Sequence, residues 1–340
     1  TSVAAILEKK DEAERARFPD LTPMLETMQE LCAILAAKRK RRGAIDFDLP
    51  EAEFQFDRKG AVVSVTPARR TIAHRIIEEF MLLANESVAE TLAASGGPAI
   101  YRVHEKPDTA KAEDFAEFAR CLGYTLNKSG GLYAPGDFQK FIARIEGRTE
   151  QKFLVYLMLR SFMQARYSES NIGHFGLATP EYTHFTAPIR RYPDLIVHRL
   201  LKRCFDKKAS PQWREDMAGR LPEIARHSSA RERAAEEAER EIEKIKKAQF
   251  MAGKVGEEFE ALVYSPSRNG FFVELMDPFV EGFVPVETLT DDHYVYREKS
   301  RAIMGRHRGR RFQPGSKIRV RLDRADTETA RLTFSVCAGR

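Results

Sequence analysis

Apolar residues recur at every third or fourth position through much of the first 250 residues, which is the spacing that places them on one face of a helix. In 22–42, Pro23 stands where a first turn tolerates a missing N–H, and Gly43 follows the last turn. The apolar face of this segment consists of Leu25, Met28, Leu31, Cys32 and Leu35. The same spacing predicts helices over 69–87, 112–122, 138–145 and 151–167, and a pair of helices within 211–245.

Residues 44–65 instead alternate apolar and polar side chains with the period of a strand. The corner Arg58–Lys59–Gly60 interrupts the alternation, which predicts a two-stranded hairpin. Asp46 and Asp48 flank Phe47 and point to one side of the first strand. They would either bind a metal ion there or form an ordinary exposed face over a buried Phe47.

The pattern changes again at Gly253. Short alternating segments predict strands over 255–263, 271–275, 281–285, 318–322 and 331–336, separated by Gly- and Pro-containing turns. Five short strands of this kind are typical of an OB barrel. The sequence therefore predicts an α+β region over residues 1–250 and a five-stranded, all-β OB barrel over 251–340.

Composition limits the class of protein. The chain has 340 residues, 43% of them apolar, and none of its apolar runs reaches the roughly 18 residues that cross a bilayer, so we expect a cytoplasmic protein without a membrane partner. Cys32, Cys121, Cys204 and Cys337 are far apart, which argues against a zinc site or a disulfide framework and predicts buried thiols. A net charge of +6 is compatible with nucleic-acid binding but does not establish it.

The segment 173–201 contains the densest set of residues that could take part in binding or catalysis. Thr186 is a good N-cap and Pro188 fits a first helical turn, so a helix is predicted to start near Ala187. Pro193 would then fall inside this helix and kink it. The predicted apolar face consists of Ile189, Tyr192, Ile196 and Leu200.

The polar residues of this segment predict a phosphate-binding site. The open N–H groups of the helix start would face the same way as Arg190 and Arg191, so a phosphate would meet backbone donors and guanidinium groups together. Arg190, Asp194 and His198 follow one another at intervals of four and would share one face. Taken singly, these three residues are more commonly an exposed surface ion pair with a neighbouring histidine.

Taken together, the segment resembles the signature of the RNase II/RNase R family of processive 3′→5′ exoribonucleases. The matching residues, at fixed spacing, are His174–Leu177, Tyr182, Phe185–Tyr192, Asp194 and His198. A second stretch, RRTIAHRIIEEFMLLAN over 69–85, resembles the catalytic domain of the same family. The resemblance implies the C-terminal portion of an RNB-type catalytic domain that acts hydrolytically on RNA 3′ ends and releases nucleoside 5′-monophosphates.

The resemblance also implies roles for individual residues. Arg190 would stabilise charge on the scissile phosphate with Arg191 beside it, and Phe47 would clamp a base. Glu78 would contact the ribose near the 3′ end, and Glu78 and Glu232 would orient the terminal nucleotides. On residue pattern alone, Glu78 is a solvated helix carboxylate and Glu232 belongs to an exposed face of alternating charges.

The region after Gly253 resembles the ribosomal protein S1-type RNA-binding domain through GFFVELMDPFVEGFVPVETL, residues 270–289. In such domains, aromatic side chains on the barrel surface stack on bases of single-stranded RNA. The resemblance implies Phe271 or Phe272, together with Phe283 and His293, as the contacts. Because side chains of a strand alternate between faces, only one of Phe271 and Phe272 can face RNA.

The resemblance covers nearly the whole chain but only the latter part of the family's architecture. We therefore expect an aspartate cluster that binds Mg²⁺ ions to lie upstream, on a preceding segment or on a companion chain, because two-metal hydrolysis needs several convergent carboxylates. The sequence has only the isolated pairs Asp46/Asp48 and Asp291/Asp292. The alternative is a non-catalytic single-stranded RNA-binding protein on the same scaffold, and an upstream Asp-rich loop would distinguish the two.

Overall fold

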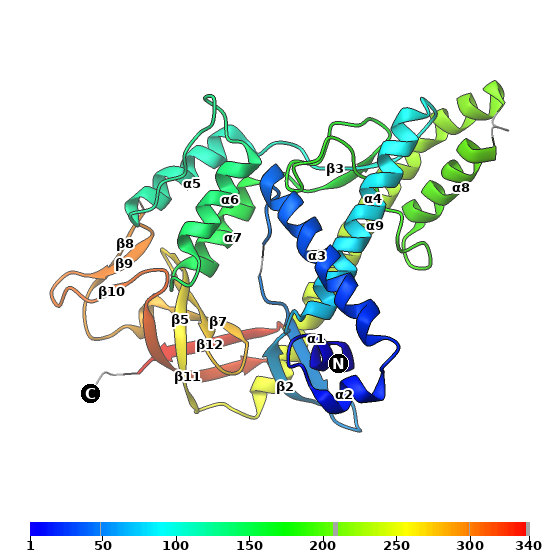
Figure 1. Ribbon diagram of the computed structural model, residues 1–340. Coiled ribbons are helices and arrows are strands. Elements are labelled where there is room, and N and C mark those ends of the chain that lie inside the picture. Colours follow the sequence, from blue (N-terminus) through cyan, green and yellow to red (C-terminus); the bar gives the residue numbers. More distant parts are fainter. Residues whose placement is uncertain (48, 207–209, 299, 338–340) are drawn as a thin grey trace.

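The structure is a computed structural model that describes residues 1–340 except 48, 207–209, 299 and 338–340. It combines a helical region with a closed barrel, as Figure 1 shows, and this confirms the predicted α+β class. The helices are α1 (Ser2–Leu7), α2 (Glu12–Arg17), α3 (Thr22–Arg42), α4 (Ile72–Ala94), α5 (Thr109–Cys121), α6 (Pro135–Ile145), α7 (Gln151–Ser161), α8 (Tyr192–Asp206) and α9 (Pro211–Ala252). The strands before the barrel are β1 (Ala52–Phe56), β2 (Val62–Pro67), β3 (Tyr101–Val103) and β4 (Arg166–Ser168).

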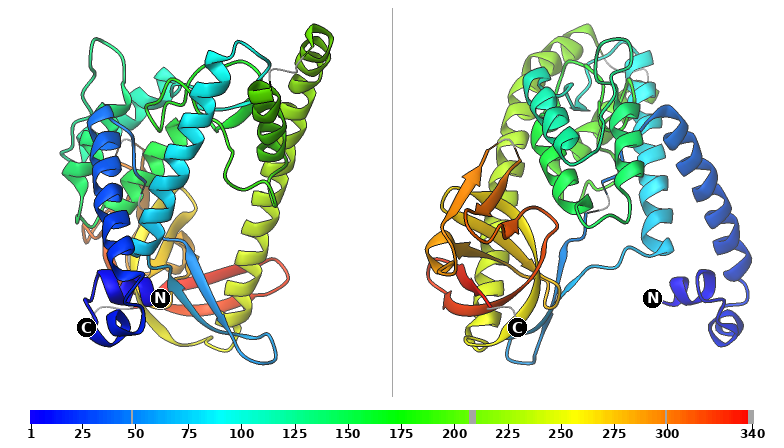
Figure 2. Two further views of the ribbon diagram at one scale, coloured as in Figure 1. Left: turned by 45° about the vertical axis from the view of Figure 1, so that its right-hand side comes forward. Right: turned by 90° about the vertical axis from the view of Figure 1, so that its left-hand side faces the viewer.

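Helix α3 spans the predicted residues and ends at Gly43, whose φ of 94° is favourable for glycine and lets the chain turn sharply. It packs beside α4, where Cys32 and Ile76 are buried in a small core that also includes Ile6 and Leu7 of α1. The predicted apolar face is only partly buried, because Leu31 remains 41% exposed. Helices α3 and α4 run side by side in both views of Figure 2.

The described residues 44–47 and 49 do not form the first strand of the predicted hairpin. They continue from α3 toward the core between α5, α6 and α7, where Ile45 is buried and donates its N–H to the Gly176 carbonyl at 2.8 Å. The hairpin itself consists of β1 and β2, paired antiparallel across the predicted turn at 58–60. The alternation before Ala52 therefore reflects burial against helices rather than pairing with a strand.

Two predicted helical segments end or continue differently in the structure. The segment 151–167 leaves the helix after Ser161, and residues 166–168 form β4, which pairs antiparallel with β3. The segment 211–245 is one helix rather than two: α9 continues through Pro222 to Ala252. Leu221 and Ala225, on either side of this proline, are buried in one core with α8, so packing offsets the lost backbone hydrogen bond.

The barrel lies at the C-terminal end of α9. Its strands are β5 (Glu258–Ser267), β6 (Gly270–Leu275), β7 (Glu281–Pro285), β11 (Lys317–Asp326) and β12 (Arg331–Val336), in the closed order β11-β12-β7-β6-β5. The five predicted strands are thus confirmed. A short 3₁₀ turn, η1 (Val286–Thr288), follows β7, and a small sheet of β8 (Tyr294–Arg297), β9 (Ala302–Gly305) and β10 (Arg311–Phe312) was not predicted. Ala248 and Met251 of α9 are buried in the barrel core, which joins the two regions.

Candidate functional site

The turn before α8 differs from the sequence prediction. Residues 187–191 form a non-helical turn, and α8 begins at Tyr192 rather than near Ala187. Pro193 therefore lies in the first turn of α8, where its missing N–H removes no helical hydrogen bond, and the predicted kink is wrong. Ile189, which was predicted to belong to the apolar face, is fully exposed.

Asp194 closes this turn from inside the protein. Its side chain is 0% exposed, and Oδ1 accepts hydrogen bonds from the Ala187 N–H at 2.9 Å and from Arg191 Nη2 at 2.8 Å. A buried carboxylate needs such a partner, because the loss of hydration would otherwise cost several kcal/mol. Asp194 Oδ2, Arg191 Nε and Thr186 Oγ1 are also buried, and none of them has a partner in the described part of the chain.

This arrangement separates three residues that were predicted to share one helix face. Asp194 points back to the turn, whereas His198 Nε2 bonds to the Phe185 carbonyl at 2.9 Å and its ring stacks on Phe185 at 4.1 Å. Arg190 lies at the exposed end of the turn, where none of the described residues pairs with it. The surface ion pair that the spacing favoured is therefore absent from the described structure at Arg190, and its guanidinium is accessible.

Arg191 reaches a pocket of about 510 Å³ that also contains Glu78 of α4. The pocket walls are partly apolar and include Ile77, Met81, Leu82, Asn85, Tyr182 and His184. Asn85 connects the two sides, because its Nδ2 donates to Tyr182 Oη at 3.0 Å and its Oδ1 accepts the Phe185 N–H at 2.9 Å. The structure thus brings together two of the residues that the sequence assigned to RNA binding.

His184 is an uncharged member of this pocket. Burial and the charges of Arg191 and Arg102 lower its pKa to about 2, so the imidazole is neutral at physiological pH. Its Nδ1 forms a hydrogen bond of 2.8 Å with the hydroxyl of Tyr167, whose pKa is raised to about 12 by burial and by the nearby Glu232. Both groups therefore act as hydrogen-bonding groups and not as charges.

Glu232 of α9 is connected to the same pocket through Arg102. It forms an ion pair with Arg102 of β3, whose guanidinium lies over the Tyr167 ring at 4.9 Å from the centroid. Glu232 is only 27% exposed at its side chain, so it is not simply part of a solvated face. The contacts Glu232, Arg102, Tyr167 and His184 form one continuous path from α9 to the pocket.

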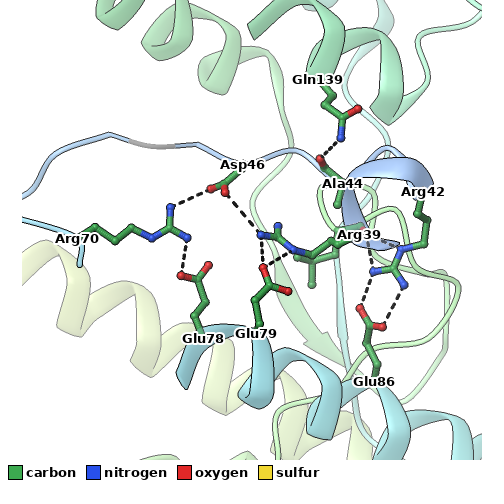
Figure 3. A network of polar contacts seen from close by, with 10 residues as sticks. Arg39, Arg42, Ala44, Asp46, Arg70, Glu78, Glu79, Glu86 and Gln139 are labelled. Carbon is green, nitrogen blue, oxygen red and sulfur yellow. Dashed lines mark hydrogen bonds and ion pairs between the residues drawn. The ribbon is translucent and has the colours of Figure 1, made fainter. Parts of the chain in front are cut away.

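Arg70 connects Asp46, the residue before Phe47, to Glu78 of α4, as Figure 3 shows. Phe47 is partly buried and meets Phe162 edge-on at a centroid distance of 5.7 Å. Arg70 forms ion pairs with Asp46, next to Phe47, at 3.3 Å and with Glu78 at 2.5 Å. Asp48, the other flanking aspartate of the prediction, lies outside the described residues.

The candidate contacts of the barrel lie on a separate surface. Phe271 is fully buried in the barrel core, so its assignment as an RNA contact is corrected. Phe272 is 47% exposed, and its ring lies 5.1 Å from that of Phe283 on the neighbouring strand. His293 is exposed just before β8. Phe272 and Phe283 thus form an aromatic pair that single-stranded nucleic acid could stack on.

Sequence reasoning did not identify Arg102, Tyr167, His184, Asn85 or His104 as parts of the site. His104 Nδ1 accepts the Gly176 N–H at 2.9 Å, and its Nε2 bonds to the Met163 carbonyl at 2.8 Å, which holds the loop before the turn. Burial lowers the pKa of His104, so it stays neutral in this role. His184 lies within the signature segment, but its role depends on partners from three other elements that spacing does not reveal.

A divalent metal ion does not fit the described residues. Among them, no group of three or more His, Cys, Asp or Glu side chains is arranged to bind one. Asp46 pairs with arginines, Asp291 accepts a hydrogen bond from Tyr294 Oη at 3.0 Å, and Asp292 accepts the backbone N–H of His307 at 3.0 Å.

The cysteines differ in how deeply they are buried. Cys32 is buried as predicted, but Cys121 is exposed, and Cys204 and Cys337 are only partly buried. The prediction of buried thiols is therefore wrong for most of them.

Across the described helices, none combines the length and the apolar character that a membrane span requires.

An OB barrel with exposed aromatic side chains is typical of a protein that binds single-stranded nucleic acid. The RNB domain matches residues 1–207, and the S1 RNA binding domain matches residues 253–336. The chain therefore belongs to the RNB family, that of RNase II and RNase R, as the resemblance implied.

Relatives with known names agree with this family. Ribonuclease R of Aquifex aeolicus is 45% identical, over 96% of this chain and 46% of that protein. Ribonuclease R 1 of Lactococcus lactis is 43% identical, over 95% of this chain and 40% of that protein. Mycoplasma genitalium RNase R in complex with ribose methylated single-stranded RNA has the same fold, with a TM-score of 0.86 and 24% identity over 94% of this chain and 50% of that one. The chain spans less than half of the length of these two curated relatives.

Proposed function

We propose that the chain is part of a cytoplasmic, hydrolytic 3′→5′ exoribonuclease that degrades RNA to nucleoside 5′-monophosphates. The observation that carries this proposal is the turn 187–191, which exposes Arg190 next to Arg191 and the pocket containing Glu78. A guanidinium that pairs with none of the described residues, on a turn fixed by a buried carboxylate, is suited to bind a phosphate.

In this proposal each residue has a distinct role. Arg190 stabilises charge on the scissile phosphate, Arg191 lines the pocket next to it, and Phe47 contacts a base. Glu78 contacts the ribose near the 3′ end, and Glu78 and Glu232 orient the terminal nucleotides through their carboxylate oxygens. Residues 251–340 act as the S1-type domain that binds the incoming strand with Phe272, Phe283 and His293, whereas residues 1–250 belong to the catalytic domain.

The proposal places Mg²⁺ outside this chain. As the family resemblance implies, we propose that carboxylates of a preceding segment or a companion chain hold it. The partner of the chain is then the 3′ end of single-stranded RNA, together with whatever polypeptide supplies those carboxylates.

The chain alone should bind single-stranded RNA with an affinity that falls steeply with salt. Each phosphate contact releases counterions, and several contacts lower the affinity by orders of magnitude between about 50 and 200 mM salt. Phe272→Ala should cost about 1–3 kcal/mol of binding free energy through lost stacking, whereas Phe56→Ala, an exposed phenylalanine of β1, should cost little. Fluorescence anisotropy with a labelled oligoribonucleotide measures both effects. An affinity indifferent to salt would contradict the proposed phosphate contacts.

The chain alone should not release mononucleotides from RNA when Mg²⁺ is added. A protein that also contains the metal-binding carboxylates should release nucleoside 5′-monophosphates from the 3′ end, which chromatography of the products measures. Release by the isolated chain would mean that the metal site lies within it. No release by the longer protein, with RNA binding intact, would favour a non-catalytic RNA-binding protein.

A further inference from the structure

Arg70 occupies a bridging position between the segment that carries Phe47 and the helix that carries Glu78. Its Nη1 lies 3.3 Å from Asp46 Oδ1, and its Nη2 lies 2.5 Å from Glu78 Oε2 (Figure 3). The guanidinium plane thus spans two carboxylates on different elements. A guanidinium presents its donors in a rigid fork, so the separation of the two carboxylates is fixed by the arginine itself.

The backbone around Phe47 has few other supports. On the N-terminal side, the Ala44 carbonyl accepts a hydrogen bond from Gln139 Nε2 at 2.7 Å, and Ile45 N–H donates to Gly176. Residues 45–47 have no strand partner, because β1 begins only at Ala52. The ion pairs of Asp46 with Arg39 and Arg70 are further side-chain contacts of the segment directly before Phe47.

Arg39 forms a second bridge from Asp46 to α4, and the two bridges differ in how exposed their arginine–glutamate pairs are. Arg39 also contacts Asp46, at 3.5 Å, and its other partner is Glu79, at 2.7 Å. The Arg39–Glu79 pair is almost completely buried, with side-chain exposures of 12% and 7%. Arg70 and Glu78 are 27% and 39% exposed, and Glu78 lines the pocket of Arg191.

The Arg70–Glu78 pair also reduces the electrostatic repulsion between Glu78 and the phosphates of RNA. A carboxylate beside the phosphates of RNA repels them, and this repulsion is reduced if a cation stays bound to the carboxylate. Arg70 contacts Oε2 of Glu78, which leaves Oε1 to accept a hydrogen bond from a ribose hydroxyl. One arginine can thus keep Glu78 compatible with RNA and aim its free oxygen.

We propose that Arg70 is a positioning residue that sets the spacing between the base contact at Phe47 and the ribose contact at Glu78. This inference rests on the proposed function, because it presumes that Glu78 contacts the terminal ribose. Arg70 itself touches protein carboxylates and acts through them. Selection for ribose over deoxyribose at the RNA 3′ end then depends on Arg70 as well as on Glu78.

The test is a double-mutant cycle read out as ribose discrimination. The chain and its variants Arg70→Gln, Glu78→Gln and Arg70→Gln/Glu78→Gln are each titrated with an oligoribonucleotide and with the same oligonucleotide carrying a 3′-terminal 2′-deoxyribose. Arg69→Gln is the matched control, because Arg69 is 77% exposed at its side chain and pairs only loosely with Glu8, at 3.5 Å. A hydrogen bond to a charged group is worth about tenfold or more in affinity.

We expect the wild type and Arg69→Gln to prefer the ribose end by about tenfold, and Arg70→Gln and Glu78→Gln each to lose most of this preference. The double variant should lose no more than either single variant, since both act on one contact. If Arg70→Gln weakens binding of both oligonucleotides equally and keeps their ratio, Arg70 is a phosphate tether and the inference is overturned. A ratio unchanged in Glu78→Gln instead removes the ribose role of Glu78, and the inference falls with that part of the proposed function.

Arg70→Lys separates positioning from folding. Lysine keeps the charge but, as a point charge, cannot hold two carboxylates in a fixed plane. We expect this variant to melt close to the wild-type temperature and to lose a large part of the ribose preference. Full retention of the preference in a folded Arg70→Lys variant would contradict the proposed role of the guanidinium fork.

Discussion

Replacing Arg190 by lysine in the catalytically complete protein is expected to lower the single-turnover rate by about 100- to 1000-fold, or roughly 3–4 kcal/mol. Arg190 is exposed on the turn 187–191, and no ion pair with another described residue restrains it. Its fork can hold two oxygens of a phosphate at once as charge builds on them. Lysine keeps the charge but loses this geometry, so transition-state stabilisation should suffer most.

Ground-state affinity for the same RNA should fall much less, because other phosphate and stacking contacts remain along the strand. A single-turnover rate and a binding curve on one oligonucleotide provide the comparison. Arg199→Lys, at an exposed position of α8, is a suitable control with an unchanged rate. Equal losses of rate and affinity in Arg190→Lys would identify Arg190 as an ordinary tether.

Asp194→Ala is expected to destabilise the chain by about 3–5 kcal/mol, which is the usual cost of breaking a buried ion pair by removing one partner. The substitution leaves Arg191, whose side chain is 20% exposed, without its carboxylate, and leaves the Ala187 N–H without an acceptor. Urea unfolding of the wild type and the variant measures the difference. Because the turn loses its internal support, the variant should also bind RNA less tightly at temperatures where it is still folded.

A matched surface substitution distinguishes this effect from general loss of charge. Glu105→Ala removes the partner of Arg166 in an ion pair whose side chains are 42% and 44% exposed, and such a pair contributes at most about 1 kcal/mol. Asp194→Asn keeps an oxygen for the Ala187 N–H and should be less harmful than Asp194→Ala. A cost for Asp194→Ala as small as that of Glu105→Ala would show that the turn does not depend on the buried pair.

Local pattern predicted most of the helices and all five barrel strands, because burial on one face imposes a period that the sequence displays. The prediction from local pattern was wrong where contacts between distant residues determine the secondary structure. Ile189 fits the apolar spacing of α8. Asp194, however, accepts a hydrogen bond from the Ala187 N–H, and this holds the turn that contains Ile189 outside the helix, so Ile189 is exposed. The end of α7 is set by the pairing of β4 with β3, whose residues lie far away in the sequence.

The candidate site was predictable only as a set of residues, and its geometry was not. Family resemblance brought Arg190, Glu78 and Glu232 into one hypothesis, whereas spacing alone favoured exposed charges at each position. The connections between them pass through Arg70 and Arg102, which belong to other elements and carry no local signal. Which of Phe271 and Phe272 faces outward was left open by alternation, since a strand defines two faces but not which one is buried.

Helix α9 carries Glu232 in its middle and ends in the barrel core at Ala248 and Met251. Ser229, just before Glu232, accepts the Tyr167 N–H at 2.9 Å, so this part of the helix cannot slide along β4. The rise of a helix places Glu232 and Ala248 roughly 24 Å apart. In the proposed function α9 therefore fixes how far Glu232 lies from the barrel: an RNA long enough to reach from Glu232 to Phe272 and Phe283 is held at two points, and a shorter one at a single point.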